Sequence, residues 1–436
     1  MTVNVGLIGL GTVGGGVYEL LKKRSGEIGS RVGCPLNLAR ACDLREGVRD
    51  DLGIPADVFT SDFNDVIGDE SIDLVTVLTG NEEFAFECIK RSFEQGKHVV
   101  TANKALLARR WREVFTLARR HGRLIYFEAS VGSGIPVIQG INEGLSANRI
   151  DRVKGILNGT TNFILTRMCR DGATLEDATE EAVRAGFAEV DSSSDISGLD
   201  AAHKLCVLAN VISPAPVNFE DIHCEGISGL DREDIVFAEN MFGFNIKLLA
   251  VLRRRDGGVE ARVHPAFIPS DDMLSGVVNE NNGILVDGDA VQDVMFYGKG
   301  AGRFPAASAV VSDITYLAQK IYHGIAGKIP YIHTDPESST TVIGMNELCF
   351  QYYLRFNTAD EPGVLSKISG ILGEEGVSIL SCFQKGRSDG DDVPIIMVTH
   401  RASEGLLKRA LERIDELPVV RSRSVFIRIE SDREIY

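Results

Sequence analysis

The 436-residue sequence contains no long hydrophobic run and no C-x-x-C pair. No apolar stretch reaches the roughly 18 residues that a membrane span needs, so we expect no transmembrane helix. The N-terminal segment has no basic residues before its apolar run, and glycines interrupt that run, so it does not resemble a signal peptide. The eight cysteines are scattered, most of them among apolar residues. We therefore expect the reduced, buried thiols of a cytoplasmic protein.

Basic residues are also fewer than acidic residues. The chain has 46 lysines and arginines against 62 aspartates and glutamates, a formal net charge of −16 at pH 7, and no basic tail. Such a chain is a poor binder of nucleic acid and of anionic membranes, and we expect neither partner. A hydrophobic content of 44% and a charged content of 25% are typical of globular proteins and exclude wholesale disorder. The length predicts two or three domains.

Strand and helix patterns alternate along residues 1–130. This alternation predicts βαβ units and an α/β fold with a Rossmann-type parallel sheet. Residues 131–333 mix helical and strand-like patterns, including one strand-like run at Gly283–Tyr297, and predict a second α/β domain with a mixed sheet. Residues 304–330 of that part are a candidate to complete the first domain.

The C-terminal part is organised differently. Residues 334–349 begin with a polar stretch rich in Ser, Thr and Pro and are the predicted linker. Residues 350–436 follow the order strand, helix, strand, strand, helix, strand, which is typical of a ferredoxin-like unit.

The sequence GLGTVG follows the first predicted strand. Its glycines are Gly9, Gly11 and Gly14, with Thr12 and Val13 between them. In a dinucleotide-binding motif the first glycine permits a tight turn and the second lets the backbone approach a pyrophosphate. The third lets helix and strand pack closely. We therefore predict a dinucleotide site here; the alternative is a glycine-rich structural turn.

Asp43 and Arg45 follow the second predicted strand, where such cofactors are distinguished. An acidic residue there binds the ribose 2′-hydroxyl of NAD, and an arginine accommodates the 2′-phosphate of NADP. The sequence offers both, so the cofactor is NADP or NAD, with NADP favoured; the alternative for Arg45 is a solvated loop charge. A second glycine cluster, YGKGAG around Gly300, either brings backbone amides to the cofactor or forms a plain turn between strand and helix.

Lys104 follows the fourth predicted strand, in the sequence TANK. Ligands of open parallel sheets bind at the carboxyl ends of the strands. A lysine near the start of a helix is disfavoured by the helix dipole, so we interpret Lys104 as a functional residue.

Asp200 and Lys204 are four residues apart and share one face of a predicted helix. For an isolated pair of this kind, the ordinary interpretation is an ion pair on the surface. Here Glu189, Asp191 and Asp195 precede the pair in a loop rich in Gly and Ser. A row of carboxylates beside a lysine suits a substrate that carries an ammonium group.

Together these motifs resemble the homoserine dehydrogenase family over essentially the whole chain. The matching segments are GLGTVGGGV at the N-terminus, TANK at 101–104, EASVGSGIP at 128–136, GILNGTTNFILTRM at 155–168, GFAEVD at 186–191, GLDAAHKL at 198–205 and YGKGAG at 297–302. Two positions depart from the pattern of the family: Ser192 stands where Pro is usual, and Ser133 where Gly or Ala is usual. Both lie in predicted loops and leave the ionisable residues in place.

The resemblance implies a reversible hydride transfer between NAD(P)H and L-aspartate 4-semialdehyde, which gives L-homoserine for threonine, methionine and isoleucine biosynthesis. Residues 131–333 would bind this substrate and form a dimer interface. Lys204 would donate the proton to the forming alkoxide, and Lys104 would polarise the carbonyl and contact the cofactor. The substrate contacts would be Glu189, Asp195, Asp200 and Thr161, and Thr79 and Gly186 would contact the cofactor. For Thr161, at an expected helix start, ordinary capping is the alternative.

The family likeness also implies a monovalent cation, with sodium as the expected ion. Its ligands would be Glu128 and the carbonyls of Val131, Ser133 and Ile135. Residues 353–371 resemble an ACT domain, a module that binds amino acids, and the implied effector is L-threonine, an end-product inhibitor. The expected effector contacts are Asp360, Gly363, Val364 and Leu365. The alternative is that this domain only joins the subunits of a homodimer or homotetramer.

Two other functions stay open at this point. A thiol-dependent semialdehyde dehydrogenase would need an activated cysteine, and Cys169 and Cys206 are the candidates. A non-catalytic regulator would use the nucleotide and amino-acid sites for sensing alone, and it predicts that Lys204 is dispensable.

Overall fold

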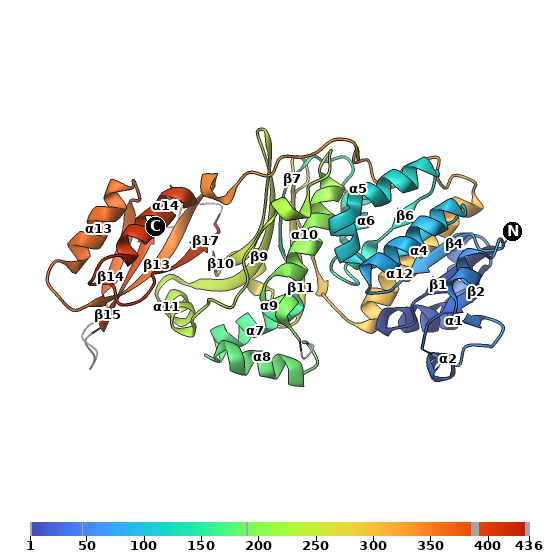
Figure 1. Ribbon diagram of the computed structural model, residues 1–436, viewed down its shortest axis with the longest axis horizontal. Helices are drawn as coiled ribbons and strands as arrows, with labels where there is room; N and C mark the ends of the chain where they lie inside the picture. Colours follow the sequence, from blue (N-terminus) through green and yellow to red (C-terminus); the bar gives the residue numbers. More distant parts are fainter. Residues whose placement is uncertain (1, 46, 189–190, 385–391, 432–436) are drawn as a thin grey trace.

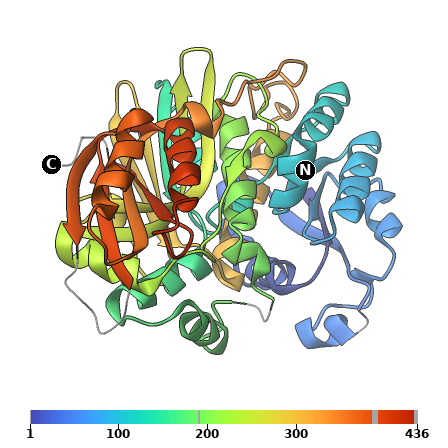
Figure 2. The same ribbon diagram turned by 60° about the vertical axis from the view of Figure 1, so that its left-hand side comes forward.

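A computed structural model describes residues 2–45, 47–188, 191–384 and 392–431. The N-terminal domain lies at one end of an elongated molecule and the ferredoxin-like unit at the other, with a long mixed sheet between them (Figures 1 and 2). Among these residues no helix combines the length and the apolar character that crossing a bilayer requires.

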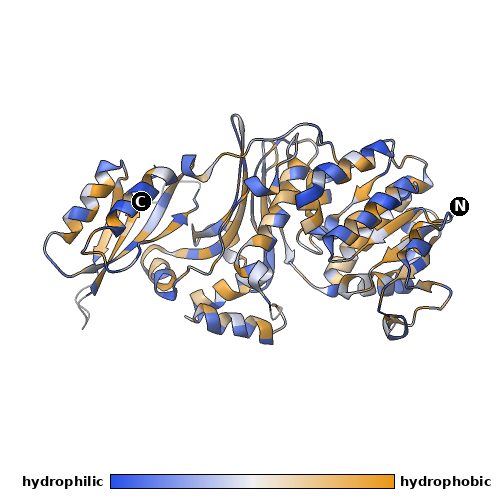
Figure 3. Cartoon of the chain, viewed as in Figure 1, coloured by the Kyte–Doolittle hydropathy of each residue, from blue (hydrophilic) through white to orange (hydrophobic). Residues whose placement is uncertain are grey.

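The N-terminal domain is built on a six-stranded parallel sheet. Its strand order, β3-β2-β1-β4-β5-β6, is that of a Rossmann fold and confirms the predicted sheet. The central strands are buried along most of their length and are coloured mainly as hydrophobic in Figure 3, as expected where helices cover both sides of a sheet. The strands are β1 (Val3–Ile8), β2 (Leu36–Cys42), β3 (Phe59–Thr60), β4 (Leu74–Val77), β5 (His98–Thr101) and β6 (Ile125–Tyr126).

The helices of this domain include one that comes from far along the chain. They are α1 (Thr12–Val32), α2 (Gly47–Leu52), α3 (Phe63–Ile67), α4 (Glu82–Glu94), α5 (Lys104–Arg120) and α12 (Arg303–Tyr322). Helix α12 packs against α1 at Gly16, where a Cβ would lie 3.0 Å from that of Ala307. The guanidinium of Arg303 also pairs with Glu19, Nη2 to Oε1 at 2.6 Å. The chain therefore returns to the first domain after building the second.

The second part of the molecule contains a mixed sheet with helices packed on it. Its strands are β7 (Ile150–Ile156), β8 (His223–Cys224), β9 (Phe244–Arg255), β10 (Gly258–Pro269), β11 (Asn281–Gly288) and β12 (Gln292–Lys299). Its longer helices are α7 (Gly159–Arg170), α8 (Leu175–Arg184), α10 (Leu199–Ile212) and α11 (Arg232–Phe242), with the short α6 (Val137–Gln139) and α9 (Ser193–Ile196). The strand-like run Gly283–Tyr297 does not form the one strand expected but belongs to the antiparallel hairpin β11–β12.

The C-terminal unit continues this sheet. Its elements are β13 (Cys349–Ala359), α13 (Val364–Glu374), β14 (Ile379–Gln384), β15 (Asp392–Thr399), β16 (Ala402–Ser403), α14 (Glu404–Asp415) and β17 (Val425–Ile429), in the predicted βαββαβ order apart from the two-residue β16. Strand β17 pairs with β10 in parallel, through Ala266–Arg428 and Phe267–Ile429, so one eleven-stranded sheet spans both parts.

Two buried arginines, Arg428 and Arg262, form ion pairs at the junction between the two parts. The guanidinium of Arg428 binds both carboxylate oxygens of Glu404 at 2.6 and 2.8 Å, and its Nη1 lies 2.6 Å from Glu225 Oε2, beside β8. Arg262 on β10 binds both oxygens of Glu430 at 2.8 and 2.9 Å. Because breaking a buried pair leaves a charge without its partner, these contacts oppose separation of the ferredoxin-like unit from the second part of the molecule.

The cysteines correct one expectation. The eight thiols are free, as predicted, but Cys224, Cys349 and Cys382 are exposed rather than buried.

The segment that follows α12 lies against the body of the protein: Thr334 is buried and its hydroxyl donates to the carbonyl of Asn210 at 2.5 Å.

Candidate active site

The glycine turn after β1 has the geometry of a phosphate-binding loop. Gly9 has a φ of 92°, a left-handed conformation that favours glycine. A Cβ on Gly14 would lie 1.9 Å from the carbonyl oxygen of Gly9, whereas a Cβ on Gly11 would meet nothing within 4 Å. Helix α1 begins directly after Gly11. The turn therefore leaves space at a helix N-terminus, which fits the pyrophosphate of a dinucleotide.

Asp43 and Arg45 lie beside this turn. The Asp43 carboxylate accepts the N–H of Leu10 at 2.8 Å and binds the Arg45 guanidinium through both oxygens, each at 3.0 Å. Although burial alone would raise it, the hydrogen bonds from Arg45 and Leu10 hold the pKa of Asp43 below its usual value. Arg45 remains largely exposed at the edge of the site.

Thr79 and Lys104 lie at the same edge of the parallel sheet. A Cβ on Gly9 would lie 2.8 Å from the carbonyl oxygen of Leu78, so the glycine turn and the end of β4 are in contact. Asn103 donates its side-chain N–H to the carbonyl of Thr79 at 3.0 Å and accepts the N–H of Leu106, which starts helix α5. Lys104 is therefore the first residue of a helix that begins just after the carboxyl end of β5, the place where the sequence put it.

Lys104, Asp200 and Lys204 form one cluster. Lys104 Nζ lies 2.5 Å from Asp200 Oδ1, and Lys204 Nζ lies 2.7 Å from Asp200 Oδ2. The side chains of Asp200 and Lys204 are only 8% and 9% exposed, so the ordinary interpretation of a surface ion pair was wrong. Lys204 Nζ also donates to the carbonyl of Leu157 at 2.6 Å. A side chain from the Rossmann domain thus meets two from the second domain.

Asn158 completes the cluster, and sequence reasoning did not select it. Its Nδ2 donates to Asp195 Oδ1 at 2.6 Å and to Asp200 Oδ2 at 2.8 Å. Its Oδ1 accepts the N–H of Thr161 at 2.8 Å and the Thr161 hydroxyl at 2.9 Å. The side-chain amide therefore starts α7 and orients two carboxylates at once. Its place before a helix was the only signal that the sequence gave.

The charges in the cluster alter one another. Burial lowers the pKa of Lys204 and the neighbouring Lys104 ammonium lowers it further, while Asp200 opposes both effects. Although burial alone would raise it, the ammonium groups of Lys204 and Lys104 hold the pKa of Asp200 well below its usual range. Asp200 is therefore ionised throughout the physiological range, and Lys204 releases its proton more readily than an exposed lysine.

Two further predicted residues, Gly186 and Glu189, follow α8 in the sequence. Glu189 falls outside the residues that the structure describes. Gly186 follows α8 with a φ of 75°. The Thr160 hydroxyl donates to the carbonyl of Phe187 at 2.7 Å, which brings the segment after α8 to the N-terminus of α7.

Glu128 is buried beside a second buried carboxyl group. Its two oxygens accept the N–H groups of Ile138 and Gln139, each at 2.8 Å, and its own N–H donates to Asp313 Oδ2 at 2.8 Å. Burial raises the pKa of Glu128 to about 7 and the pKa of Asp313 well above its usual value. Ser133, in the loop that follows Glu128, has a φ of 56°. Among the described residues no three His, Cys, Asp or Glu side chains gather as a metal site.

The residues predicted for the effector lie far from this centre, at the opposite end of the molecule (Figure 1). Gly363 has a φ of 90° and precedes α13. Asp360 and Leu365 are exposed, whereas Val364 is buried. Three of the four predicted effector contacts are therefore at the surface.

The thiol candidates do not have the properties of nucleophiles. Burial raises the pKa of both Cys169 and Cys206 to about 12, so they are protonated near neutral pH. Cys206 Sγ lies 3.5 Å from the carbonyl of Ala108, between packed helices. The structure thus gives no support to a thiolate mechanism at these positions.

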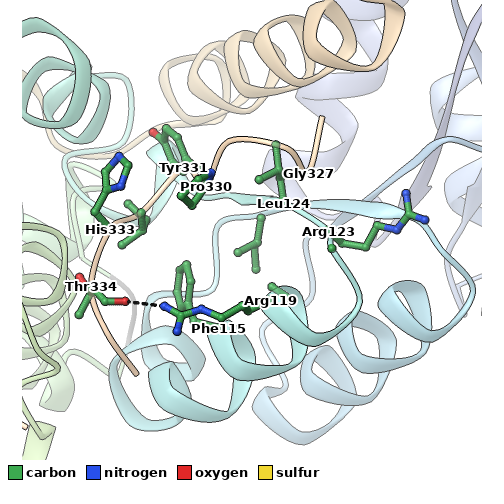
Figure 4. A pocket seen from close by; sticks show the side chains of 13 residues that line it. Phe115, Arg119, Arg123, Leu124, Gly327, Pro330, Tyr331, His333 and Thr334 are labelled. Carbon is green, nitrogen blue, oxygen red and sulfur yellow. Dashed lines mark hydrogen bonds between the residues drawn. The ribbon is translucent and has the colours of Figure 1, made fainter. Parts of the chain in front are cut away.

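A cavity of about 370 Å³ lies between α5, β6 and residues 327–334 (Figure 4). Phe115, Leu124 and Tyr331 form much of its wall, and Arg119 donates across it to the carbonyl of Thr334 at 3.4 Å. None of the described residues that line it belongs to the glycine turn or to the Lys204 cluster. The cavity is therefore separate from the candidate active site.

Three family models match the chain. The model described as "Homoserine dehydrogenase, NAD binding domain" matches residues 9–128, "Homoserine dehydrogenase" matches residues 136–315, and "ACT domain" matches residues 352–419.

Individual proteins match over nearly the full length. The homoserine dehydrogenases of Neisseria gonorrhoeae and Pseudomonas aeruginosa are 40% and 41% identical, over 98% of this chain and 99% of each relative. A solved homoserine dehydrogenase from Thiobacillus denitrificans superposes with a TM-score of 0.93 at 40% identity, covering 99% of this chain and 98% of that one. A hyperthermophilic archaeal homoserine dehydrogenase in complex with NADPH has a TM-score of 0.61 at 28% identity, over 72% of this chain and 97% of its own.

Proposed function

Because the chain belongs to the homoserine dehydrogenase family, we propose that the Lys204–Asp200–Lys104 cluster performs the hydride-transfer chemistry of that family. The protein is an NAD(P)-dependent oxidoreductase that acts on a CH–OH group in amino-acid biosynthesis. The reaction interconverts L-homoserine and L-aspartate 4-semialdehyde. The observation that carries the proposal is the single carboxylate, Asp200, that two lysines share at the carboxyl edge of the Rossmann sheet.

Lys204 is the proposed proton donor and acceptor. NAD(P)H, when bound, supplies the hydride, and NAD(P)⁺ accepts it in the reverse direction. As the aldehyde carbon is reduced, Lys204 Nζ donates a proton to the new alkoxide oxygen; in oxidation, neutral Lys204 takes the hydroxyl proton. Burial and Lys104 lower the pKa of Lys204, which suits this exchange nearer to neutral pH. Lys104, which is 40% exposed, stabilises the negative charge on the carbonyl oxygen.

The carboxylates around the cluster are the proposed site for the substrate ammonium group. Asp195 is half-buried and Asp200 is buried, and Asn158 holds both in place. Glu189 is proposed as a further contact from the family resemblance. Thr161 lies at the N-terminus of α7, where backbone amides suit the substrate carboxylate.

The proposed cofactor site runs from the glycine turn to the cluster. Gly9, Gly11, Thr12, Val13 and Gly14 would bind the pyrophosphate, and Thr79, Lys104, Gly186 and Gly300 would line the nicotinamide side. We propose a preference for NADP. The exposed Arg45 guanidinium is placed to turn from Asp43 to a 2′-phosphate, while the Asp43 carboxylate is already occupied by Leu10 and Arg45.

A monovalent cation, with sodium as the expected ion, is proposed at Glu128 and the carbonyls of Val131, Ser133 and Ile135. All four ligands offer oxygen, which suits a hard cation. The buried Glu128 and Asp313 carboxyls would gain from a nearby positive charge. The role would be structural. Replacing sodium by tetramethylammonium at equal ionic strength should lower the melting temperature; an unchanged melting temperature would speak against the site.

The ACT domain is proposed to bind L-threonine at Asp360, Gly363, Val364 and Leu365 and to inhibit the enzyme. Support comes from the junction, because the ion pair Arg428–Glu225 joins the domain to the segment beside the active site. The N–H of Ile227 donates to the carbonyl of Ile196 at 2.9 Å, one residue from Asp195. Ile227 lies two residues after Glu225, so a movement of the ACT domain that displaces Glu225 would also displace α9.

A homodimer or homotetramer in the cytoplasm is proposed from family membership. Size-exclusion chromatography with light scattering distinguishes these states from a monomer.

The activity assay that tests the function uses L-homoserine with NAD⁺ and with NADP⁺, each with and without L-threonine. Stoichiometric reduction of the nucleotide is expected, faster with NADP⁺ and slower in the presence of threonine. No reduction of either nucleotide would return the protein to the non-catalytic alternative.

A further inference from the structure

Asn282 connects the proposed proton donor to the second glycine cluster. It lies on β11 opposite Gly298 of β12 and is completely buried. Its Nδ2 donates to the carbonyl of Leu157 at 3.0 Å, and the same carbonyl accepts Lys204 Nζ at 2.6 Å. A carbonyl oxygen has two lone pairs, so the asparagine and the lysine fill both.

Gly300 makes this arrangement possible. A Cβ at Gly300 would lie 2.1 Å from Asn282 Oδ1 and 2.5 Å from its Nδ2, so a side chain there would collide with the amide. Backbone on one side and a hydrogen bond on the other confine the amide, so it has little room to move away. The glycine at position 300 is therefore required by the asparagine, whatever else the YGKGAG turn contacts.

The orientation of the amide is fixed by its surroundings. Rotating it by 180° would set Oδ1 against the Leu157 carbonyl, which places two acceptors together. In the observed orientation Oδ1 has no hydrogen-bond partner among the described residues. A buried amide with an unsatisfied oxygen is destabilising, so the Nδ2 contact and the surrounding packing must offset that cost.

We propose that Asn282 is a positioning residue of the hydride-transfer reaction: it holds the Leu157 carbonyl that aims the Lys204 ammonium at the reacting oxygen. By taking one lone pair, it also weakens the hold of that carbonyl on the ammonium, which leaves the proton easier to transfer. The proposal rests on the proposed role of Lys204.

The test compares Asn282→Ala and Asn282→Ser, in the full-length enzyme, with the neighbouring control Asn281→Ala. The Asn281 side chain donates to the carbonyl of Val278 instead. We expect kcat for homoserine oxidation to fall about tenfold or more in Asn282→Ala, because misplacing a catalytic group by about 1 Å can reduce rates up to about 100-fold. KM for homoserine and the Kd for NADPH, measured by fluorescence, should stay within about twofold. Asn282→Ser, which keeps a donor, should lose less, and Asn281→Ala should be unaffected.

The pH profile gives a second readout. Without the competing N–H, the Leu157 carbonyl holds the Lys204 ammonium more tightly, so the rise of kcat with pH should move to higher pH in Asn282→Ala. A merely structural role would lower the amount of folded enzyme and leave this pH dependence unchanged.

Gly300→Ala tests the contact from the other side. Alone, it should reduce kcat about as much as Asn282→Ala, because its Cβ displaces the amide. Added to Asn282→Ala, it should lower kcat by less than it does alone, since the two changes share the contact between Gly300 and the Asn282 amide. Independent effects in the double variant, or an unchanged kcat and pH profile in both folded Asn282 variants, would overturn the positioning role while leaving that of Lys204 intact. Full activity of Lys204→Ala would overturn both.

Discussion

Lys104 and Lys204, which come from different domains, bind opposite oxygens of the Asp200 carboxylate, at 2.5 and 2.7 Å. The shared carboxylate sets the spacing of the two ammonium groups, and the two ammonium groups keep the carboxylate ionised. One of the two lysines is buried and the other is partly exposed, so they suit different tasks. This relationship leads to a prediction about pH.

The pH dependence of homoserine oxidation should move in opposite directions in Lys104→Gln and Asp200→Asn. Oxidation needs neutral Lys204, so kcat rises as pH passes through the pKa of that lysine. Lys104 lowers this pKa and Asp200 raises it. The rise should therefore shift to higher pH in Lys104→Gln and to lower pH in Asp200→Asn, beside a lower maximal kcat in both. Shifts in the same direction would contradict Lys204 as the titrating group.

Cofactor preference should depend on Arg45. Replacing it with alanine removes the charged partner proposed for the 2′-phosphate, and hydrogen bonds to charged groups contribute about 1.5–3 kcal/mol. We expect KM for NADP⁺ to rise about tenfold or more while KM for NAD⁺ changes little. Arg49→Ala, which removes a half-buried arginine that pairs with Asp50, is the matched control. Equal changes for both nucleotides in Arg45→Ala would show that Arg45 does not contact the 2′-phosphate.

Gly14→Ala should abolish nucleotide binding or prevent folding. Its Cβ would lie 1.9 Å from the Gly9 carbonyl, and neither backbone segment can yield without opening the turn. Gly26, in the same helix, is the control, because a Cβ there meets nothing within 4 Å. Gly26→Ala should raise the free energy of unfolding by about 0.5–1 kcal/mol in chemical denaturation. Normal NADPH affinity in Gly14→Ala would be inconsistent with the turn described above.

Inhibition by threonine should depend on the ion pair between Arg428 and Glu225 at the junction. Glu225→Gln keeps the size of the side chain but removes its charge beside Arg428. We expect the threonine concentration for half-inhibition to rise about fivefold or more, the lower end of typical coupling energies, with kcat in the absence of threonine within about twofold. Glu374→Gln, which removes an exposed ion pair with Arg413 within the ACT domain, should behave like the original protein.

If Glu225→Gln is inhibited as before, the junction pair does not transmit the signal. If the original protein is not inhibited by threonine at all, the proposed regulation itself is wrong.

The sequence predicted the parts of the site that have a local pattern. The glycine spacing located the turn after β1, and the spacing of Asp200 and Lys204 put them on one helix face. Whether that pair was buried depended on how α5 packs against α10, which involves residues about 100 positions apart and leaves no local signal.

Other parts of the site had no pattern to find. The Leu157 carbonyl is backbone, and the position of Asn158 at an expected helix start did not reveal that its amide reaches Asp195 and Asp200. Asn282 lies on β11, which the sequence pattern did not separate from β12. The turn between these two strands interrupts the strand-like run only briefly. The pairing of β10 with β17 could not be predicted either, because the two residues of each pair lie more than 150 positions apart in the sequence.

The most direct test of the account is kcat for homoserine oxidation by Lys204→Ala, with NADPH affinity measured on the same preparation. Removing the general base should lower kcat about 100-fold or more, with the Kd for NADPH within about twofold. Lys247→Met is the matched control: Lys247 is also buried, burial lowers its pKa to about 8, and its Nζ donates to the carbonyl of Val277 at 2.6 Å. That variant should keep kcat within a few fold. Unchanged turnover in folded Lys204→Ala would contradict the proposed mechanism.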